Sequence, residues 1–232
     1  SDPTGLHGFY VNDLHPTTPL PVYSVLLQHK STQKPRSVIA RLDCLHYWTG
    51  AFALRGDLYP KVGIRMRGAS VCMTPKPYLK LRFQRGRELA GQHKLNLQSL
   101  WTDKSLVRER LSWDIFQDLG LPSCRAEYVR GHSNGQYYGL FTALENVDGN
   151  MLERNGFDPD GSLYKSIGSN EEPDGGSPGP WEKKTNENGD FSDLRTFLRN
   201  LHETSITKLR TFFGTSTDAD RIIDYQLGQI LI

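Results

Sequence analysis

The chain has 232 residues, with 28 Lys and Arg against 26 Asp and Glu, and 37% of its residues are hydrophobic. This length can bury a hydrophobic core, while a formal net charge of +2 excludes a polyacidic tail protein and argues against an obligate DNA-binding protein. The three cysteines (Cys44, Cys72 and Cys124) are too few for a disulfide scaffold, form no CxxC motif for zinc and show no sign of pairing. No apolar stretch approaches the roughly 20 residues that span a bilayer, so we expect a soluble α+β protein without membrane insertion.

The N-terminal part of the chain is expected to be irregular at first and then to form strands. Residues 1–21 are rich in Pro, Thr and His, which predicts a loosely ordered lead-in. Val22–Leu27 is apolar and predicts a strand, with which Val38–Leu42 is expected to pair. In Lys61–Arg67 and Tyr78–Phe83 apolar and basic residues alternate, and this period of two predicts two half-buried strands.

A helix and a hairpin follow. Asp103 or Ser105 can cap a helix whose apolar residues recur every three or four positions from 106 to 119, before Gly120 and Pro122 end it. Asn134-Gly135 between two strand-like runs, Ala126–Arg130 and Tyr137–Leu144, is typical of a β-hairpin.

The C-terminal part is expected to be mainly helical. Val147–Arg154 predicts a helix, Leu163–Lys165 a short strand, and the Gly- and Pro-rich residues 168–190 an exposed, mobile loop. Three amphipathic helices are expected after Asp190, and the chain stops inside the third, so we expect a fragment of a longer protein. The expected organisation is a lead-in with the first strands (1–60), a sheet lobe with a helix (61–165), a mobile loop (166–190) and the start of a helical lobe (191–232).

Residues 61–87 form a cationic strip, defined by eight basic residues and no Asp or Glu: Lys61, Arg65, Arg67, Lys76, Lys80, Arg82, Arg85 and Arg87. One interpretation is a solvated sheet face, because antiparallel sheets commonly expose one face to water. The other is a site for phosphates or another polyanion, since Gly68 and Ser70 follow Arg67 in a turn whose backbone N–H groups can point at phosphate oxygens.

Glu109 lies on the helix that follows the basic strands. It either belongs to the helix itself, as a cap or as a partner of Arg108 or Arg110, or pairs with a strand lysine. Protein kinases use the second arrangement to hold nucleotide phosphates. The seven His residues show no HxH or HExxH spacing, so no metal site is expected.

Several segments, taken together in order and spacing, resemble the spore-coat protein H (CotH) kinase family across roughly residues 60–228. The matching segments are Ile64–Arg82 (IRMRGASVCMTPKPYLKLR), His93–Trp113 (HKLNLQSLWTDKSLVRERLSW), Asn134–Asp148 (NGQYYGLFTALENVD), Leu163–Lys165 (LYK) and Trp181–Glu187 with Asp193-Leu194 (WEKKTNE…DL).

The resemblance implies an atypical protein-kinase-like fold that binds ATP with Mg²⁺ or Mn²⁺ and phosphorylates Ser or Thr in protein substrates. It places Arg67 and Ser70 in the loop that covers the phosphates, although Val71 replaces a second Ser that the family often has. It places Lys76 and Lys80 in the basic strand, where one of them should contact the phosphates; strand parity slightly favours Lys80. Glu109 falls where a helix glutamate would steady that lysine.

Glu145 follows the hairpin strand, where a kinase hinge would hold adenine through backbone groups; equally, it can cap the helix at Val147. The catalytic and metal-binding block of the family is expected after Ile232, so neither Asp220 nor Asp224 is assigned that role and no catalytic or metal residue is expected here. The fragment is therefore expected to lack turnover.

Two other functions compete with the kinase interpretation. The first is a non-catalytic adhesion or coat-assembly module, because the family resemblance permits cell-surface, spore-coat and secreted proteins alike. The second is nucleic-acid binding through the cationic strip, which is disfavoured because residues 148–193 hold eleven Asp and Glu against four Lys and Arg.

Overall fold

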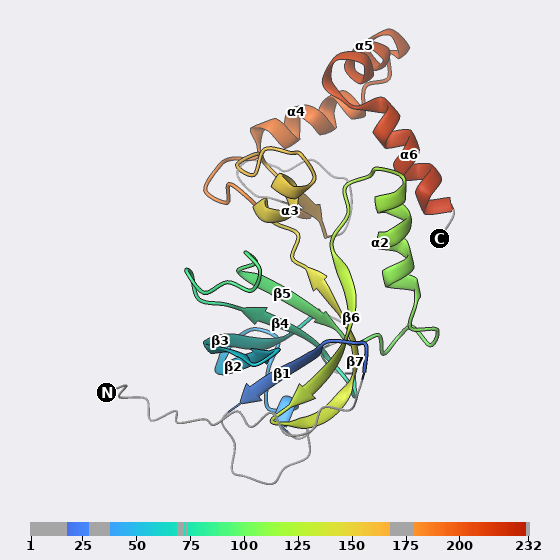
Figure 1. Ribbon diagram of the computed structural model, residues 1–232. Coiled ribbons are helices and arrows are strands. Elements are labelled where there is room, and N and C mark those ends of the chain that lie inside the picture. Colours follow the sequence, from blue (N-terminus) through green and yellow to red (C-terminus); the bar gives the residue numbers. More distant parts are fainter. Residues whose placement is uncertain (1–17, 28–37, 69–71, 73, 168–178, 231–232) are drawn as a thin grey trace. The chain divides into compact units, whose positions relative to one another are not determined.

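The computed structural model describes residues 18–27, 38–68, 72, 74–167 and 179–230 (Figure 1). The chain divides into two compact units, which are described separately: Ser1–Arg110 with Cys124–Asn146, and Leu111–Ser123 with Val147–Ile232. Residues 1–17 of the predicted lead-in and residues 168–178 of the predicted loop lie outside the described residues.

The first unit is a closed barrel of seven strands in the order β1-β2-β3-β4-β5-β7-β6. The strands are β1 (Val22–Leu27), β2 (Trp48–Leu54), β3 (Asp57–Arg67), β4 (Tyr78–Arg82), β5 (Lys94–Gln98), β6 (Ala126–Ser133) and β7 (Gln136–Glu145). The strands predicted at 22–27, 61–67 and 78–83 and the hairpin around Asn134-Gly135 are therefore confirmed. The predicted α+β class is confirmed as well, and the sheet is closed rather than open.

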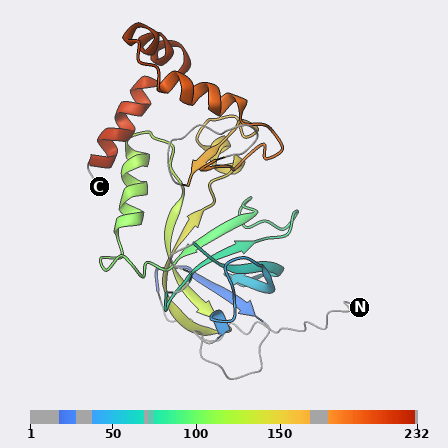
Figure 2. The same ribbon diagram turned by 180° about the vertical axis from the view of Figure 1, so that it is seen from behind.

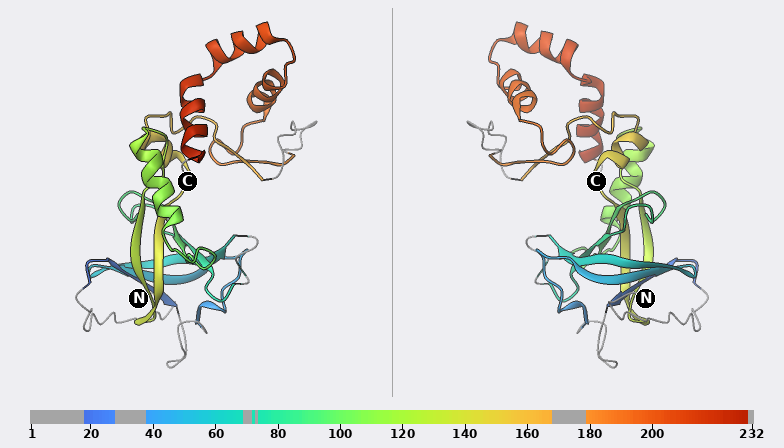
Figure 3. Two further views of the ribbon diagram at one scale, coloured as in Figure 1. Left: turned by 90° about the vertical axis from the view of Figure 1, so that its right-hand side faces the viewer. Right: turned by 90° about the vertical axis from the view of Figure 1, so that its left-hand side faces the viewer.

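One parallel pair closes the barrel. β1 runs parallel to β6, with Val22 opposite Arg130, whereas all the other neighbouring strands of the barrel are antiparallel. Alternate residues point inward and exclude water from the interior. Residues fully buried there include Phe52, Val62, Ile64, Leu79, Leu81, Leu97, Val129 and Phe141. Figure 3 shows the β6–β7 hairpin as a long yellow-green pair.

Two features of the first strands differ from the predictions. The prediction of a strand at Val38–Leu42 is wrong. Val38 and Ile39 instead form a helical turn, and their apolar side chains are buried. β2 was not predicted, because Gly50 interrupts its apolar pattern. A Cβ at Gly50 would lie 2.4 Å from the carbonyl oxygen of Leu26, so glycine permits the close approach of β1.

Helix α2 (Arg108–Asp118) begins in the first unit and continues in the second. Asp103 caps its start: Asp103 Oδ2 accepts a hydrogen bond from the Arg108 N–H at 2.9 Å. Gly120, at φ +69°, follows the end of the helix, as predicted. Leu106 and Val107 lie outside the helix, although their spacing fits its apolar pattern.

The second unit contains helices and a small two-stranded sheet. Its elements are α3 (Gly149–Arg154), β8 (Tyr164–Ser166), β9 (Trp181–Lys183), α4 (Ser192–Leu201), α5 (Ile206–Ser216) and α6 (Ala219–Ile230). The prediction of a loop is wrong at Trp181–Lys183, because these residues form β9 and pair with β8 in antiparallel register. No helix among the described residues is both long and apolar enough to span a membrane.

Aromatic contacts hold the helices of this unit together. Phe197 of α4 and Phe212 of α5 have ring centroids 5.5 Å apart, and Phe116 of α2 and Tyr225 of α6 have centroids 5.4 Å apart. Figure 2 shows α4, α5 and α6 following one another, with α6 beside α2.

Candidate functional site

The outer face of the barrel, opposite its hydrophobic interior, carries basic and polar side chains. Arg65 of β3 lies opposite Lys80 of β4, and two residues further along Arg67 lies opposite Tyr78. Lys80 in turn lies opposite Asn96 of β5. The residues between them in each strand belong to the buried core, so these side chains share the outer face.

A carboxylate from α2 joins this face. Glu109 Oε1 accepts a hydrogen bond from Gln98 Nε2 at 3.0 Å. Burial raises the pKa of Glu109, although the bond from Gln98 and the positive charge of Arg67 act in the opposite direction. Burial also lowers the pKa of Arg67, against the effect of Glu109, yet an arginine remains charged at neutral pH. The cation whose charge acts on Glu109 is thus Arg67.

Several buried polar atoms on this face have no hydrogen-bond partner within the part of the chain that the structure describes. They are Arg67 Nη1, Asn96 Oδ1, Gln98 Oε1 and Thr142 Oγ1. Gln98 and Thr142 lie directly opposite each other on β5 and β7. Leaving a buried polar group without a hydrogen bond costs about 1–3 kcal/mol. A polar ligand that bonded to these atoms would remove that cost, which favours its binding here. We call Arg67, Lys80, Asn96, Gln98, Glu109 and Thr142 the outer-face cluster.

Lys76 lies at the end of the barrel where β5 ends at Gln98, and it contacts the backbone there rather than the outer-face side chains. Its ammonium donates to the carbonyl oxygens of Ser99, at 2.8 Å, and Leu140, and it lies 4.1 Å from the centroid of the inward-facing Phe141 ring. Gly139 leaves room for it, since a Cβ there would lie 2.9 Å from Lys76 Nζ. Burial lowers the pKa of Lys76 to about 8.

The Glu145 side chain lies on the inner face at the opposite end of the barrel. It is 3% exposed, accepts a hydrogen bond from the Arg125 N–H at 3.0 Å and lines a cavity of about 350 Å³. Glu145 lies five positions along β7 from Leu140, or roughly 17 Å of strand. The alternative that Glu145 caps the next helix is wrong, because Asp148 is the N-cap of α3.

The residues predicted from the sequence therefore divide into three groups. Arg67, Lys80 and Glu109 share the outer-face cluster, whereas Lys76 and Glu145 lie at opposite ends of the barrel. Ser70 lies outside the described residues. The backbone at Glu145 is nevertheless close to the outer-face cluster, since Asn96 Nδ2 donates to the Glu145 carbonyl oxygen at 3.3 Å.

The stability of the barrel is expected to rise with pH between about 8 and 9.5 because of Lys76. Below pH 8 this lysine is protonated in both states; above it the folded form loses the proton, while the unfolded lysine, with a pKa of 10.5, retains it. The unfolded state then binds more protons, so the free energy of unfolding increases, by up to about 1 kcal/mol after allowance for partial exposure. Urea unfolding at several pH values measures this change in the free energy of unfolding.

The matched variants for this measurement are Lys76→Met and Lys104→Met, the latter at an exposed position. Lys76→Met should remove the pH-dependent increase, and Lys104→Met should keep it. An equal increase in all three proteins would contradict the assignment to Lys76.

Gln98, Asn96 and Thr142 were missed by the sequence analysis because they are uncharged and lie within strands. The signal that could have identified them is polar residues at buried strand positions, as in Leu95-Asn96-Leu97-Gln98, where Asn96 is 3% and Gln98 6% exposed.

The fold and this site define a mixed α+β protein in which barrel strand β3 and helix α2 supply a half-buried cation and a carboxylate to the same outer face. A profile of the family described as CotH kinase protein matches residues 64–232, and the chain belongs to this family. The resemblance inferred from the sequence motifs is thereby confirmed.

The chain is also similar to the inner spore coat protein H of Bacillus subtilis (strain 168). The two are 28% identical over 106 residues, which cover 46% of this chain and 29% of that protein. The match thus spans less than a third of the relative's length.

Proposed function

We propose that the outer-face cluster binds the phosphates of ATP and that this chain is the nucleotide-binding part of a protein kinase that phosphorylates Ser or Thr in protein substrates. The observation that carries the proposal is the half-buried Arg67 on the outer face, whose Nη1 has no hydrogen-bond partner among the described residues, together with the helix carboxylate Glu109, which is bound to Gln98 of the same face. Membership of the CotH kinase family supports it. In this proposal the barrel corresponds to the sheet lobe of a kinase-like fold and the second unit to the start of its helical lobe.

The chemistry of the cluster suits a triphosphate. Arginine offers a planar set of N–H donors that matches phosphate oxygens, and Arg67 Nη1 is a buried donor with no partner among the described residues. Glu109 would orient Arg67, as a helix glutamate orients the phosphate-binding lysine in protein kinases. Lys80, two residues along β4 from the partner of Arg67, would supply a second cation.

The proposal places adenine near the end of β7. There the Glu145 backbone accepts a hydrogen bond from Asn96, which itself lies opposite Lys80. A nucleotide whose base lies at this end and whose phosphates reach Arg67 would lie along β5. The polar atoms of Asn96, Gln98 and Thr142 would then face the ligand.

In this proposal the Mg²⁺ or Mn²⁺ ion binds mainly to the phosphates of the nucleotide. In the described ranges no group of three or more His, Cys, Asp and Glu side chains could hold a metal ion. Mg²⁺ usually binds through substrate phosphates with one or two carboxylates, so Mg²⁺ or Mn²⁺ would arrive with ATP. No residue of this chain is named as its ligand.

Titration of the chain with ATP and Mg²⁺ in a calorimeter tests the proposal. We expect saturable binding of one nucleotide, weaker for ADP and weakest for AMP, because the cationic face contacts the phosphates. Mn²⁺ should support binding as well. Absence of saturable binding at millimolar ATP would refute the nucleotide site, and equal affinity for AMP and ATP would refute the role of the cations.

A coat-assembly module is the second candidate, favoured by the name of the spore coat relative. It predicts that the chain binds a coat or surface protein and no nucleotide. The same titration therefore separates the two candidates.

A further inference from the structure

A cavity lies at the end of the barrel where β7 ends. It has a volume of about 350 Å³ and is lined by residues of β1, β5 and β7, by the start of β6 with Arg125 before it, and by the turn that connects β4 to β5. All of these residues belong to the first unit, and none belongs to the outer-face cluster. Because pockets for small molecules have volumes of about 300–1,000 Å³, this cavity is large enough for a ligand of its own.

The buried part of the cavity lining is largely apolar. Leu89, Leu95 and Ala143 line the cavity, and all three are buried members of the hydrophobic core of the barrel. The aliphatic part of a ligand would leave water on contact with these side chains, which favours its binding through the hydrophobic effect.

Two carboxylates line the same cavity. Glu145 is 3% exposed, and its Oε2 accepts a hydrogen bond from the backbone N–H of Arg125 at 3.0 Å. Glu127 of β6 is exposed and lies opposite Ala143, two residues before Glu145 on β7. Residues in this diagonal relation are about 7–8 Å apart between their Cα atoms. One small charged group can therefore contact a carboxylate inside the cavity and another at its edge.

A buried tyrosine holds the outer carboxylate in place. The Tyr23 hydroxyl donates a hydrogen bond to Glu127 Oε1 at 2.5 Å, and its ring packs edge-on against Phe52 with centroids 5.2 Å apart. Burial, together with the bond to Glu127, raises the pKa of Tyr23, so the hydroxyl remains a donor near neutral pH. This bond uses one oxygen of Glu127, and the carboxylate can accept further bonds at the other.

The turn between β4 and β5 adds an uncharged acceptor. Leu89 and Gln92 exchange two backbone hydrogen bonds, at 3.2 and 2.9 Å, around Ala90 and Gly91, which both have positive φ angles, as in a type I′ turn. Gln92 also lines the cavity. Its Oε1 is shielded from solvent and has no hydrogen-bond partner among the described residues. The cavity thus presents three acceptor groups and favours a ligand with several donors.

The balance of charge favours a cation. Arg125 is the one basic residue that lines the cavity, and within the described ranges its guanidinium forms no ion pair with Glu127 or Glu145. Arg55 lies near Tyr23 but does not line the cavity. An ammonium or a guanidinium suits two carboxylates and an amide oxygen, because it offers only N–H donors and is attracted to negative charge. A metal ion such as Ca²⁺ takes six to eight oxygen ligands, which this lining does not offer.

We propose that this cavity binds an organic cation, namely an ammonium or guanidinium group on a short aliphatic stem. The charged group bonds to Glu145, Glu127 and Gln92 Oε1, and the stem packs against Leu89 and Leu95. Two sources carry this chemistry: free small amines or guanidines, and the Lys or Arg side chains of peptides. The inference goes beyond the proposed function and does not depend on it.

Calorimetric titration of the full chain without nucleotide tests the inference. The probes are butylguanidine, pentylamine and the blocked peptide acetyl-Gly-Arg-Gly-amide, with 1-pentanol as an uncharged compound of similar shape. We expect saturable binding of one cation and an affinity for 1-pentanol that is lower by about tenfold or more, because the charge-assisted hydrogen bonds are lost. Hydrogen exchange should slow in peptides covering residues 89–95 and 125–127 when the cation is bound.

Three variants assign the binding to this cavity. Glu145→Gln keeps an acceptor for the Arg125 N–H and removes the charge, and it should weaken cation binding by about tenfold or more. Glu127→Gln should weaken it by about threefold, because water screens an exposed charge. Since Glu127 is exposed, this second variant keeps the test decisive if Glu145→Gln does not fold. Glu187→Gln, at an exposed position in the second unit, should bind normally.

The outcomes separate the two sources and the ways in which the inference fails. Binding of butylguanidine or pentylamine without the peptide supports a free small cation, and binding of the peptide supports a basic side chain. Saturable binding of no cation, equal affinity for 1-pentanol, or unchanged affinity in both glutamate variants would overturn the site. Since no sample contains ATP, each of these results stands whether or not the outer-face cluster binds a nucleotide.

Discussion

Alanine in place of Arg67 is expected to weaken the binding of MgATP to this chain by about 10- to 100-fold. A hydrogen bond to a charged group contributes about 1.5–3 kcal/mol, and each 1.4 kcal/mol corresponds to a tenfold change in affinity. Arg67 is half-buried and its Nη1 is shielded from solvent, so water cannot easily take its place beside a phosphate. Calorimetric titration of Arg67→Ala with ATP and Mg²⁺ measures the change.

Two lysine variants and an exposed arginine provide the controls. Lys80→Ala should also weaken binding while the protein stays folded, because this side chain lies on the outer face. Lys76→Ala should mainly lower the free energy of unfolding, because its ammonium binds backbone carbonyls inside the barrel end. Arg87→Ala, at an exposed position, should bind MgATP normally. Wild-type affinity in both Arg67→Ala and Lys80→Ala would refute the proposed phosphate site.

Phe52→Ala is expected to lower the free energy of unfolding of the barrel by about 3–5 kcal/mol. The Phe52 side chain is 0% exposed, and its ring contacts those of Tyr23, Tyr59 and Phe83 at centroid distances of 5.2, 5.9 and 5.5 Å. Removing it leaves a cavity and ends all three contacts. Since a domain is stable by only about 5–15 kcal/mol, a large part of its stability would be lost. Urea unfolding followed by circular dichroism measures it.

The matched control is Leu58→Ala, on β3, where the side chain is 40% exposed. Its effect should stay within about 0.5 kcal/mol, as for most surface substitutions. A loss below 1 kcal/mol in Phe52→Ala, by the same measurement, would show that the aromatic cluster is not central to the barrel.

The strands with regular alternation could be predicted from the sequence, and the closure of the barrel could not. Lys61–Arg67 and Tyr78–Phe83 alternate because one face of each strand is buried, and this is a local pattern. The pairing of β1 with β6 joins residues about a hundred positions apart, such as Val22 and Arg130, and leaves no local signal. β2 was not predicted because Gly50 is a residue type common in turns. Glycine is required there because the backbone of Leu26 approaches closely.

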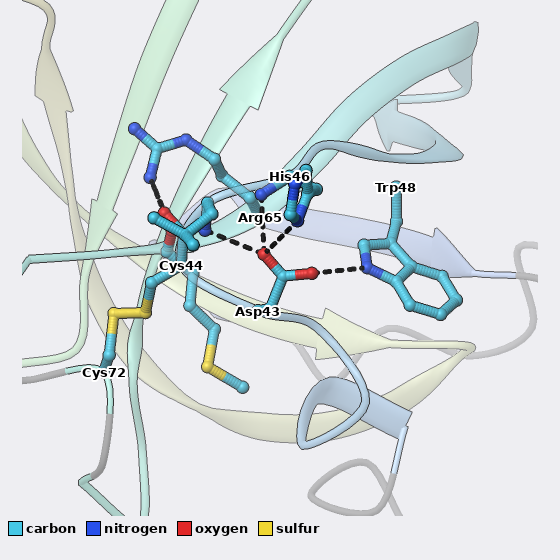
Figure 4. A network of polar contacts seen from close by, with 8 residues as sticks. Asp43, Cys44, His46, Trp48, Arg65 and Cys72 are labelled. Atoms are coloured by element: carbon cyan, nitrogen blue, oxygen red, sulfur yellow. Dashed lines mark hydrogen bonds and ion pairs between the residues drawn. A yellow bond between two sulfur atoms is a disulfide. The ribbon is translucent and has the colours of Figure 1, made fainter.

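The residues of the candidate site could be predicted from the sequence only where they are charged. Arg67, Lys80 and Glu109 are charged residues in a recognisable order, and the fold brings all three to one side of the sheet. Lys76 belongs to the same motif as Arg67 and Lys80, and Glu145 to a third motif. These two residues lie at opposite ends of the barrel, because sequence order does not reveal which end of a strand a side chain reaches. The structure contains a disulfide between Cys44 and Cys72 (Figure 4), which the sequence analysis missed because a separation of 28 residues carries no pairing signature.

The parallel pair that joins β1 to β6 sets the order in which the chain can fold. During synthesis the first strand emerges long before its final neighbour, and until residues 126–133 follow, the growing sheet has exposed edges at both sides. Contacts between distant parts of a chain form late and slow the folding of β proteins. In a nascent chain the β1 edge therefore stays without its final partner until residues 126–133 have been translated.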